Sequence, residues 1–357
     1  MTARLTRPLA FALLLLLAGL MIWAMIVPAA PVAMAKDTST YNDVNLYEDV
    51  AAAVAQGKSY YQTVADLHRA HGYPLQPFFV VRLPTMAWVA ALLGWPAMRA
   101  IGMLLLVGGG LTWFAALRST HTRAELLVAL LFAVILGGGM VASPGLVFMH
   151  EGWVGLLLFP ALALLWRWPN RWPLALLFAA MALALRELAL PFVLLAGANA
   201  IAKRDWRQAL AWAGLAALFA LGMMLHRAQV LGLTWPGDMA STGWSAMGGL
   251  SQLVGSVTLS SSLQLLPAPL ARMAALLPLL GWLALRGSRG LHVWLWFAGM
   301  ALAIALFARP DNVYWGFVLM PAYMIGLALV PRLIVDLWHG LAGKPEPEKP
   351  EPQKIAS

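Results

Sequence analysis

The chain has 357 residues, of which 61% are hydrophobic and 11% are charged. Since soluble domains carry roughly 25% charged residues, this composition excludes an ordinary soluble enzyme and predicts an integral membrane protein. Lys and Arg outnumber Asp and Glu by 24 to 15, which favours cytoplasmic loops beside anionic lipid headgroups over a nucleic-acid partner, and the absence of cysteine excludes thiolate catalysis, disulfides and cysteine-ligated zinc.

The first apolar run extends from Pro8 to Val27 and follows Arg4 and Arg7. It is longer than the roughly 7 to 15 residues of a signal-peptide core and matches the roughly 20 residues that cross a bilayer. The sequence at 33–35, Ala-Met-Ala, is typical of a signal-peptidase site, so a cleaved signal is the alternative. We interpret the run as a retained transmembrane helix with a cytoplasmic N-terminus.

Further apolar runs are each long enough to enter the bilayer, and short basic connectors separate several of them. The runs cover residues 97–117, 124–142, 152–167, 172–201, 208–225, 270–285, 291–308 and 315–331. The positive-inside rule predicts that four basic connectors face the cytoplasm: 118–123, 167–171, 203–207 and 286–289. This orientation predicts about ten transmembrane helices with both ends cytoplasmic, and two long outer loops at residues 28–96 and 226–269.

Two segments do not fit as simple spans. The 172–201 run is basic at both ends, so it is expected to return as a hairpin whose tip carries Arg186, Glu187 and Pro191, facing protein or water. Phe78 to Leu93 lies between an outer loop and an inner connector, which predicts a re-entrant or interfacial helix at the outer surface.

The predicted fold class is therefore all-α: a polytopic membrane protein with outer-face interfacial helices. Residues 1–343 are expected to form one transmembrane domain. Residues 344–357, rich in Pro, Glu and Lys, are expected to form a disordered cytoplasmic tail. The loop 226–269, rich in Gly, Ser and Leu, is expected to be a mobile cover.

Acidic residues are concentrated in the first outer loop. Five of the fifteen fall there, and they are Asp37, Asp43, Glu48, Asp49 and Asp66. Residues 44–55 have a helical pattern that places Asp43 at the N-cap and Tyr47 one turn later. An ordinary helix cap is therefore one reading of Asp43, and a catalytic base is the other.

Three short motifs of this loop carry a family resemblance: Asp43-x-x-x-Tyr47, then Gly57-x-x-Tyr60-Tyr61, then Arg82-x-Pro84 leading into an apolar helix. With the preceding transmembrane helix, they resemble the GT-C superfamily of membrane glycosyltransferases. The resemblance implies a polyprenyl-phosphate sugar donor, an active site on the non-cytoplasmic face and an acid in the first outer loop.

On this sequence the matching acid is Asp43, and Glu48 and Asp49 are neighbouring alternatives. Tyr60 and Tyr61 are candidate substrate contacts from the same motifs. The chain is short for the superfamily and shows no soluble C-terminal domain, so we expect either a minimal transferase or an inactive relative.

A donor phosphate needs cations at the outer face, and the candidates are Arg82, Arg186 and Arg309, with His150 as a further one. Each arginine has a structural alternative. Arg82 could reach lipid headgroups, Arg186 could pair with Glu187, and Arg309 could cap the end of the 291–308 helix.

Glu151 matches by position an acid that lies near the site in GT-C relatives, and it is the second catalytic candidate. A carboxylate pair of Asp43 and Glu151 could bind a divalent metal ion with the substrate phosphate, although no ligand spacing in the sequence specifies a metal. Arg309 and Asp311 belong to a turn rich in groups that bind sugars or phosphate, and this is also an ordinary turn composition.

The sequence thus favours a glycosyltransferase of the bacterial inner membrane that transfers a sugar to an envelope lipid, glycan or protein. One alternative is an O-antigen ligase or polymerase, although its catalytic loop usually falls late in the chain, where this sequence has few ionisable residues. Another is a transporter or flippase for lipid-linked glycans, which should show internal repeats with ionisable groups at the membrane midplane, and no repeat is evident.

Overall fold

A computed structural model describes residues 6–27, 41–143 and 147–342 of the chain, and the regular elements in these ranges are helices. One pair of residues in these ranges, Gln76 and Ala240, forms an isolated β-bridge. The all-α class is therefore confirmed. The predicted peptidase site at 33–35 and the predicted disordered tail at 344–357 lie outside the described residues.

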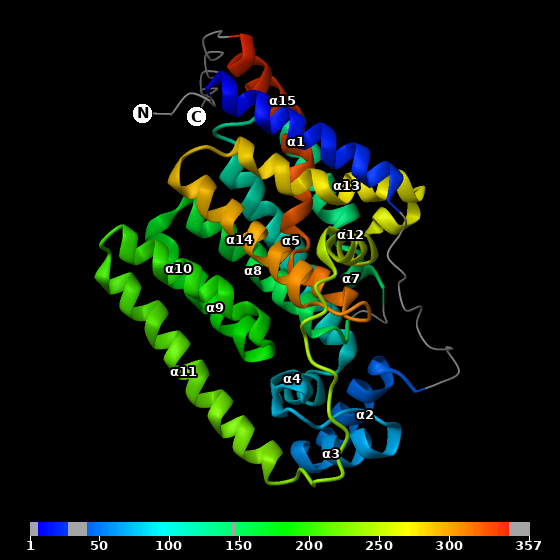
Figure 1. The fold of residues 1–357 in the computed structure, drawn as a ribbon. Helices are drawn as coiled ribbons and strands as arrows, with labels where there is room; N and C mark the ends of the chain where they lie inside the picture. The colour runs from blue at the N-terminus through cyan, green and yellow to red at the C-terminus, as the bar shows by residue number, and fades with distance from the viewer. Residues whose placement is uncertain (1–5, 28–40, 144–146, 343–357) are drawn as a thin grey trace.

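The helices are labelled in Figure 1. The α-helices are α1 (Arg7–Ile26), α2 (Asp43–Ala55), α3 (Tyr60–His71), α4 (Thr85–Leu93), α5 (Trp95–Leu117), α6 (Arg123–Leu131), α7 (Gly139–Ala142), α8 (His150–Arg167), α9 (Trp172–Leu185), α10 (Leu190–Ala202), α11 (Trp206–Leu231), α12 (Gly249–Leu259), α13 (Ala268–Gly281), α14 (Gly287–Phe307) and α15 (Ala322–Ala342). Short 3-10 or π-helical segments are η1 (Phe78–Val80), η2 (Phe132–Leu136), η4 (Pro169–Arg171), η5 (Glu187–Ala189), η6 (Ser262–Leu265), η7 (Trp282–Ala284) and η8 (Val313–Val318).

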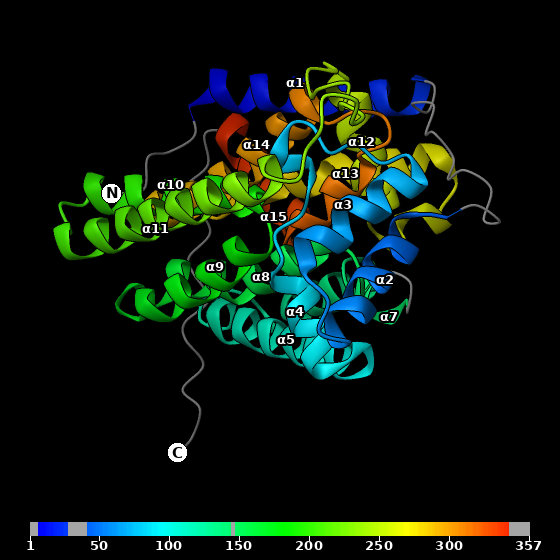
Figure 2. The same ribbon diagram turned by 90° about the horizontal axis from the view of Figure 1, so that it is seen from below.

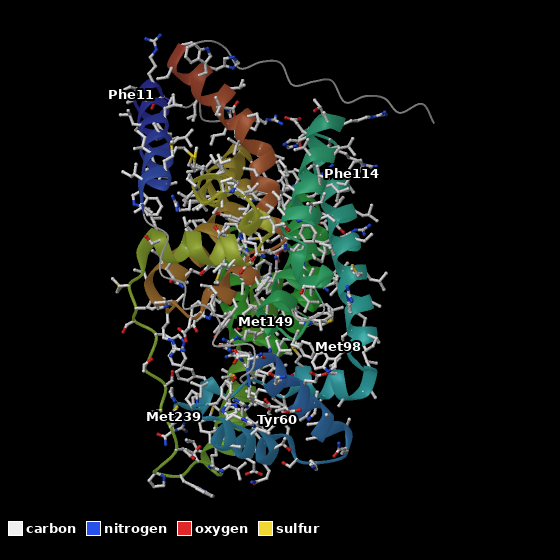
Figure 3. The ribbon with its side chains drawn as sticks, turned by 90° about the vertical axis from the view of Figure 1, so that its right-hand side faces the viewer. Phe11, Tyr60, Met98, Phe114, Met149 and Met239 are labelled. Atoms are coloured by element: carbon white, nitrogen blue, oxygen red, sulfur yellow. The ribbon has the colours of Figure 1, made fainter. Side chains whose placement is uncertain are left out.

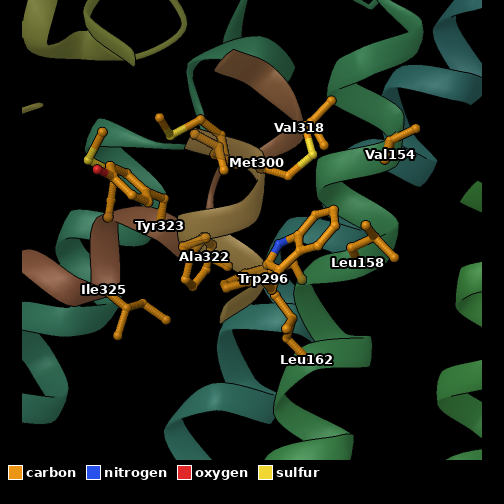
Figure 4. Close-up of a cluster of buried hydrophobic side chains, with 14 of the residues drawn as sticks. Val154, Leu158, Leu162, Trp296, Met300, Val318, Ala322, Tyr323 and Ile325 are labelled. Carbon is orange, nitrogen blue, oxygen red and sulfur yellow. The ribbon is translucent and has the colours of Figure 1, made fainter. Parts of the chain in front are cut away.

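The centre of the bundle is α8, which is buried on every face from His150 to Leu165. A helix that is apolar all round belongs inside a bundle, and neighbouring helices cover this one. Figure 4 shows side chains of α8 such as Leu158 packing beside Trp296 of α14 and Ala322 of α15. Gly155 allows the closest approach, because a Cβ there would lie 2.1 Å from the Met320 carbonyl oxygen.

Five helices in the described ranges are long and apolar enough to cross a bilayer: α1, α5, α11, α14 and α15. Shorter apolar segments lie between them, at Phe78–Leu93, Pro169–Leu185, Glu187–Ala202, Gly249–Leu259 and Ala268–Ala284. Lipid-facing lengths of this kind support a membrane protein. Helix length alone does not establish about ten spans.

The predicted hairpin at 172–201 is confirmed as two helices, α9 and α10, that meet at a break. The break begins at Arg186, whose extended backbone ends α9, and continues through η5. Pro191, in the first turn of α10, fits there because the first helical N–H groups have no intrahelical partner. Figures 1 and 2 show α10 and α11 side by side at one edge of the molecule.

The prediction that 226–269 is a mobile loop is wrong for much of that range. The helix α11 continues to Leu231, and α12 buries Leu253, Val254 and Val257 against η8, α13 and α14. These apolar positions have the spacing of one helical face. The surrounding Gly and Ser residues hide that pattern when composition alone is considered.

Two other predicted runs are interrupted. The run 124–142 divides into α6, the π-helical η2 and α7, and the run 315–331 begins with η8 before α15 starts at Ala322. Pro321 directly precedes α15 and has no backbone N–H for a helix that would continue from η8.

The helices α2, α3 and α4 form a small cap at one end of the bundle, shown at the bottom of Figure 3. Leu46, Val50, Tyr60 and Val64 pack into a separate apolar core there. The predicted re-entrant or interfacial helix over Phe78–Leu93 is divided into η1 and the nine-residue helix α4. We call α2 to α4 the outer cap, because they lie outside the helical bundle at its end.

The segment that follows α11 is fastened to the outer cap. Arg69 Nε and Nη2 donate to the two Asp238 carboxylate oxygens at 2.8 and 2.9 Å, and Arg69 lies 3.9 Å from the Trp235 ring centroid. The bridge of Gln76 with Ala240 continues this attachment. Sequence reasoning did not detect this attachment, because 169 residues separate Arg69 from Asp238.

Candidate active site

Several of the charged residues singled out in the sequence meet where α8 begins. His150 and Glu151 open α8, Arg186 lies at the break between α9 and α10, and Arg82 lies on the connection that enters α4. Figure 3 shows this level of the molecule, with Met149 between the helical bundle and the outer cap.

Glu151 is the centre of a buried ion cluster. Its Oε1 accepts a hydrogen bond from Arg186 Nε at 2.8 Å and lies 3.8 Å from Arg82 Nη2. Arg186 Nη1 also lies 2.5 Å from Glu187 Oε1. The side chains of Glu151 and Arg186 are 2% and 4% exposed. The structure therefore shows the pairing of Arg186 with Glu187 that was the alternative to phosphate binding, and adds Glu151 as a second partner.

The guanidinium of Arg82 is held more loosely than that of Arg186. Its described side-chain contacts are Nε to Tyr47 Oη at 3.3 Å, Nη2 to Tyr314 Oη at 3.5 Å and Nη2 to Glu151 at 3.8 Å. Charge-assisted hydrogen bonds are normally about 2.7 to 2.9 Å long, and a guanidinium has five N–H donors. Arg82 is nevertheless largely covered, with 15% of its side chain exposed. It therefore has unused capacity for an anion.

The prediction that Asp43 caps α2 is wrong, because Asn42 is the N-cap. The Asn42 Oδ1 accepts from the backbone N–H of Val44 at 2.9 Å, and the Asn45 side chain reaches back to the Asn42 N–H. Asn and Asp are similar N-cap residues. A cap at Asp43 would place Leu46 at the position of Asn45, and leucine has no side-chain acceptor for the return bond.

The Asp43 side chain lies half-buried among tyrosines. Burial raises the pKa of Tyr73, and the charge of Asp43 and a hydrogen bond to it raise that pKa further. The carboxylate is also within electrostatic range of Tyr47 and Tyr314. Both of these tyrosines contact Arg82, so Asp43 lies one side chain away from the loosely held guanidinium.

A small pocket lies beside Arg82, with a cavity volume of about 20 Å³, and a water molecule needs roughly 10 to 15 Å³ measured in this way. A sugar would therefore enter only if the outer cap moved relative to α8. The lining is apolar except near Arg82, and includes Leu46, Tyr47, Tyr60, Met86, Trp95 and His150.

Two buried polar atoms, one in the lining of this pocket and one reached from Arg82 through Tyr314, have no hydrogen-bond partner among the described residues. They are His150 Nδ1 and Asn312 Nδ2, in residues that are 3% and 1% exposed. The Asn312 Oδ1 accepts from Tyr314 Oη at 3.0 Å, and Tyr314 Oη contacts Arg82. Asn312 is therefore connected to Arg82 through the Tyr314 hydroxyl. Unsatisfied buried groups are costly, and a bound ligand or water would satisfy them.

Glu48 and Asp49 are not part of this cluster. Both are exposed, and Asp49 Oδ2 accepts from Tyr41 Oη at 2.8 Å. They follow Tyr47 by one and two residues on α2, so helical geometry turns them away from the face that meets Arg82.

Tyr60 and Tyr61 have structural contacts. The Tyr60 hydroxyl donates to the backbone carbonyl of Arg82 at 2.6 Å and so fixes the position of this residue. The Tyr61 hydroxyl lies 3.2 Å from His226 Nδ1, which joins α3 to α11.

Arg309 and Asp311 form a separate group. Arg309 Nε and Nη2 lie 3.2 Å from the two Asp311 carboxylate oxygens, and Nη1 donates to Ser241 Oγ at 2.9 Å and Thr242 Oγ1 at 3.1 Å. Arg309 therefore fastens the segment after α11 to the turn before η8. Tyr314, which contacts Arg82, lies in η8 directly after this turn.

A divalent metal ion has no evident site in the described ranges, where no three His, Asp or Glu side chains come together. The one acid at the centre of the cluster, Glu151, already faces two guanidinium groups. A metal-bridged pair of Asp43 and Glu151 therefore gains no support from this geometry.

Sequence reasoning did not assign Tyr47, Asn312 and Tyr314 to the site. Tyr47 was visible as the residue one turn after Asp43, but the other two lie more than 200 residues further along the chain. Tyr314 contacts Arg82 and Asn312 contacts Tyr314, and both contacts depend on how η8 and the turn before it pack against α8.

Comparison with known proteins found no match to a protein-family model, to a characterised protein or to a solved structure. The case for a function therefore depends on the geometry of this site and on the first-loop motifs.

Proposed function

We propose that the protein is a membrane glycosyltransferase that takes a sugar from a polyprenyl-phosphate donor and transfers it to an envelope lipid, glycan or protein. The observation that carries the proposal is a half-buried carboxylate, Asp43, one side chain away from a covered arginine, Arg82, whose guanidinium has only long contacts among the described residues. A base and an anion holder are the two groups that such a transfer needs.

Arg82 is a better phosphate holder than Arg186. The close contacts of Arg186 with Glu151 and Glu187 already neutralise its charge, and an anion would have to displace a carboxylate from it. Arg82 can donate to a phosphate oxygen without losing a short hydrogen bond. The Asn312 amide nitrogen, which has no partner among the described residues, can provide a further donor, whereas the Tyr314 hydroxyl already donates to Asn312 Oδ1.

In an inverting displacement, the acceptor hydroxyl oxygen forms a bond to the anomeric carbon while the bond from that carbon to the phosphate oxygen breaks. The acceptor proton passes to the Asp43 carboxylate, and the negative charge of the departing lipid phosphate develops against Arg82. Tyr47 remains a neutral phenol, because burial raises its pKa. A neutral phenol can accept from Arg82 and donate to a carboxylate, so Tyr47 can hold these two groups in fixed positions.

The membrane arrangement belongs to the same proposal. About ten spans, with both termini in the cytoplasm of a bacterial inner membrane, would place the outer cap on the periplasmic side. The donor lipid would then reach Arg82 from the outer leaflet.

Substitution of Asp43 by asparagine tests the proposal. Since Asn42 provides the cap, the change removes mainly a first-turn charge that typically contributes about 0.3 to 1 kcal/mol. Loss of a general base typically lowers a rate by about 10² to 10⁴. We expect purified Asp43→Asn to keep its thermal midpoint and its affinity for polyprenyl phosphate while losing transfer to that extent.

The assay uses a panel of polyprenyl-phosphate hexoses and pentoses, with Asp49→Asn as the matched control because Asp49 lies on another face of α2. Near-normal transfer by Asp43→Asn would show that another residue is the general base. If the wild type binds polyprenyl phosphate but transfers no sugar of the panel, a carrier of lipid-linked glycans becomes the better assignment.

A further inference from the structure

Three elements meet at a point remote from the candidate active site. The helix α10 ends at Ala202, the turn that follows carries Lys203, and α14 begins nearby at Gly287 and packs against α10. From this turn α11 runs for 26 residues before its other end meets α3 and η1. At 1.5 Å per residue that distance is about 39 Å.

Two exposed cations, Lys203 and Arg289, lie within electrostatic range of each other at this point. Partial burial, followed by the charge of Arg289, lowers the pKa of Lys203. Neither residue forms an ion pair within the ranges that the structure describes. Asp205 is the nearby acid, but its Oδ1 already accepts the Gln208 N–H at 3.1 Å as the cap of α11. Solvent screens the repulsion between two exposed cations, and a bound anion would remove what remains of it.

The start of α14 adds further positive potential. This helix of 21 residues has no side-chain cap at its N-terminus, so its first N–H groups and the positive end of its dipole are available to an anion. A terminus of this kind is a common phosphate position when other cations are present.

A buried imidazole at the same place lacks a partner. His292 lies one turn after Arg289 on α14, within electrostatic range of Lys203, and it is 5% exposed. Its Nε2 has no hydrogen-bond partner among the described residues. Since buried polar atoms are normally satisfied, this atom is a second and independent indication of a ligand-binding site.

We propose that Lys203, Arg289, His292 and the N-terminus of α14 form a phosphate-binding site, which we call the α14 site. Trp206, which is 62% exposed next to this turn, suits the headgroup level of a membrane. A phosphate of an anionic phospholipid is therefore the expected ligand, and a soluble phosphate is the other source of the same chemistry. The α14 site does not depend on the proposed sugar transfer.

The test uses the full chain in nanodiscs of phosphatidylcholine with and without phosphatidylglycerol, and native mass spectrometry counts the phosphatidylglycerol retained during delipidation. The double variant Lys203→Gln and Arg289→Gln should lose retention by on the order of tenfold, because two charge-assisted contacts are removed. The matched control is Arg118→Gln with Arg123→Gln, which removes the same charge from another basic connector and should retain the lipid.

A second pair of variants separates lost binding from lost folding. The exchange Lys203→Arg with Arg289→Lys preserves both charges and should restore most of the retention. Inorganic phosphate distinguishes the two sources. If it raises the thermal midpoint of the wild type and not of the glutamine pair, without any selective retention of phosphatidylglycerol, the α14 site serves a soluble phosphate.

Equal retention by the glutamine pair and the wild type, with no response to inorganic phosphate, would overturn the α14 site. Equal losses in the glutamine pair and the Arg118 and Arg123 control would also overturn it. They would show that the lipid responds to net charge alone.

Discussion

At the scale of single residues, the site depends on how two arginines share one carboxylate. Glu151 Oε1 lies 2.8 Å from Arg186 Nε and 3.8 Å from Arg82 Nη2, so the first arginine is paired and the second retains free donors. The sequence identified both only as candidate phosphate holders. It could not rank them, because their difference depends on side chains supplied by α8 and η8.

Substitution of Arg82 by lysine should separate binding from folding. A lysine ammonium keeps the charge but cannot donate in the planar geometry that joins Tyr47, Tyr314 and a phosphate. We expect affinity for polyprenyl phosphate to fall by about tenfold or more while the thermal midpoint stays close to that of the wild type. Isothermal titration with a short-chain polyprenyl phosphate measures this.

Arg309→Lys is the control for Arg82→Lys, since Arg309 forms its own group with Asp311 and Ser241. Equal donor affinity in the Arg82 variant and the wild type would return Arg186 to consideration as the phosphate holder.

Glu151 should matter more for stability than for chemistry. Glu151→Gln removes the carboxylate from between Arg82 and Arg186, and breaking a buried ion pair in this way typically costs about 3 to 5 kcal/mol. Glu187→Gln should cost at most about 1 kcal/mol, because the Glu187 side chain is 32% exposed. Thermal or denaturant unfolding of the two variants in the same detergent gives the comparison.

The opposite pattern would revise the role of Glu151. If Glu151→Gln keeps its midpoint and loses sugar transfer, Glu151 is the catalytic carboxylate that sequence position suggested.

At the scale of elements, charge patterns and apolar composition predicted the hairpin and the long apolar helices. The boundaries of the shorter helices depend on local turn and capping interactions. Basic residues at both ends of the 172–201 run were enough to predict the α9–α10 hairpin, and apolar composition was enough for the long helices. The start of α2 was misplaced by one residue, because Asn42 and Asp43 both cap helices and only the return bond from Asn45 distinguishes them. The helix α12 was missed because Gly and Ser dilute its apolar face.

The outer cap should lose stability in acid through His68 of α3. This residue is 6% exposed, and its Nδ1 lies 2.8 Å from the Pro74 carbonyl oxygen. Burial, with a smaller contribution from the charge of Arg82, lowers the pKa of His68 to about 4. In the unfolded chain a histidine titrates near about 6.5.

Between these values the unfolded state binds the proton and the folded state does not, so stability falls as pH decreases from about 6.5 to about 4. The loss should approach roughly 3 kcal/mol at the acid end. His68→Gln keeps a side-chain donor for Pro74 but does not titrate. The thermal midpoint of the wild type should therefore fall more steeply with acid than that of the variant. Parallel curves would assign the acid sensitivity to other groups.

At the scale of the whole molecule, the two proposed sites lie at opposite ends of α11. Arg82 and Asp43 belong to the end with the outer cap, and Lys203 and Arg289 belong to the end with the basic connectors. The interval of about 39 Å exceeds the roughly 30 Å of a bilayer core. One site can therefore face each leaflet. In this arrangement, a lipid bound at the α14 site would stabilise the helical bundle from one leaflet, and the donor would bind from the other leaflet.

Cysteine labelling tests this arrangement, and it requires no background correction because the chain contains no cysteine. Ser59 is exposed before α3, where its side chain makes no cap bond, and Ser288 is exposed at the start of α14. In intact cells whose outer membrane is permeable to the reagent, an impermeant maleimide should label Ser59→Cys. It should label Ser288→Cys only after the inner membrane is opened.

Labelling of both variants in detergent provides the control, since it shows that bound lipid does not shield Ser288→Cys. If Ser288→Cys reacts in intact cells and Ser59→Cys does not, the molecule has the reverse orientation. The outer cap and Arg82 would then face the cytoplasm, and the donor would have to bind from the inner leaflet. If both react from the same side, the two ends of α11 are not separated by a bilayer, and the assignment of α11 as a span would be wrong.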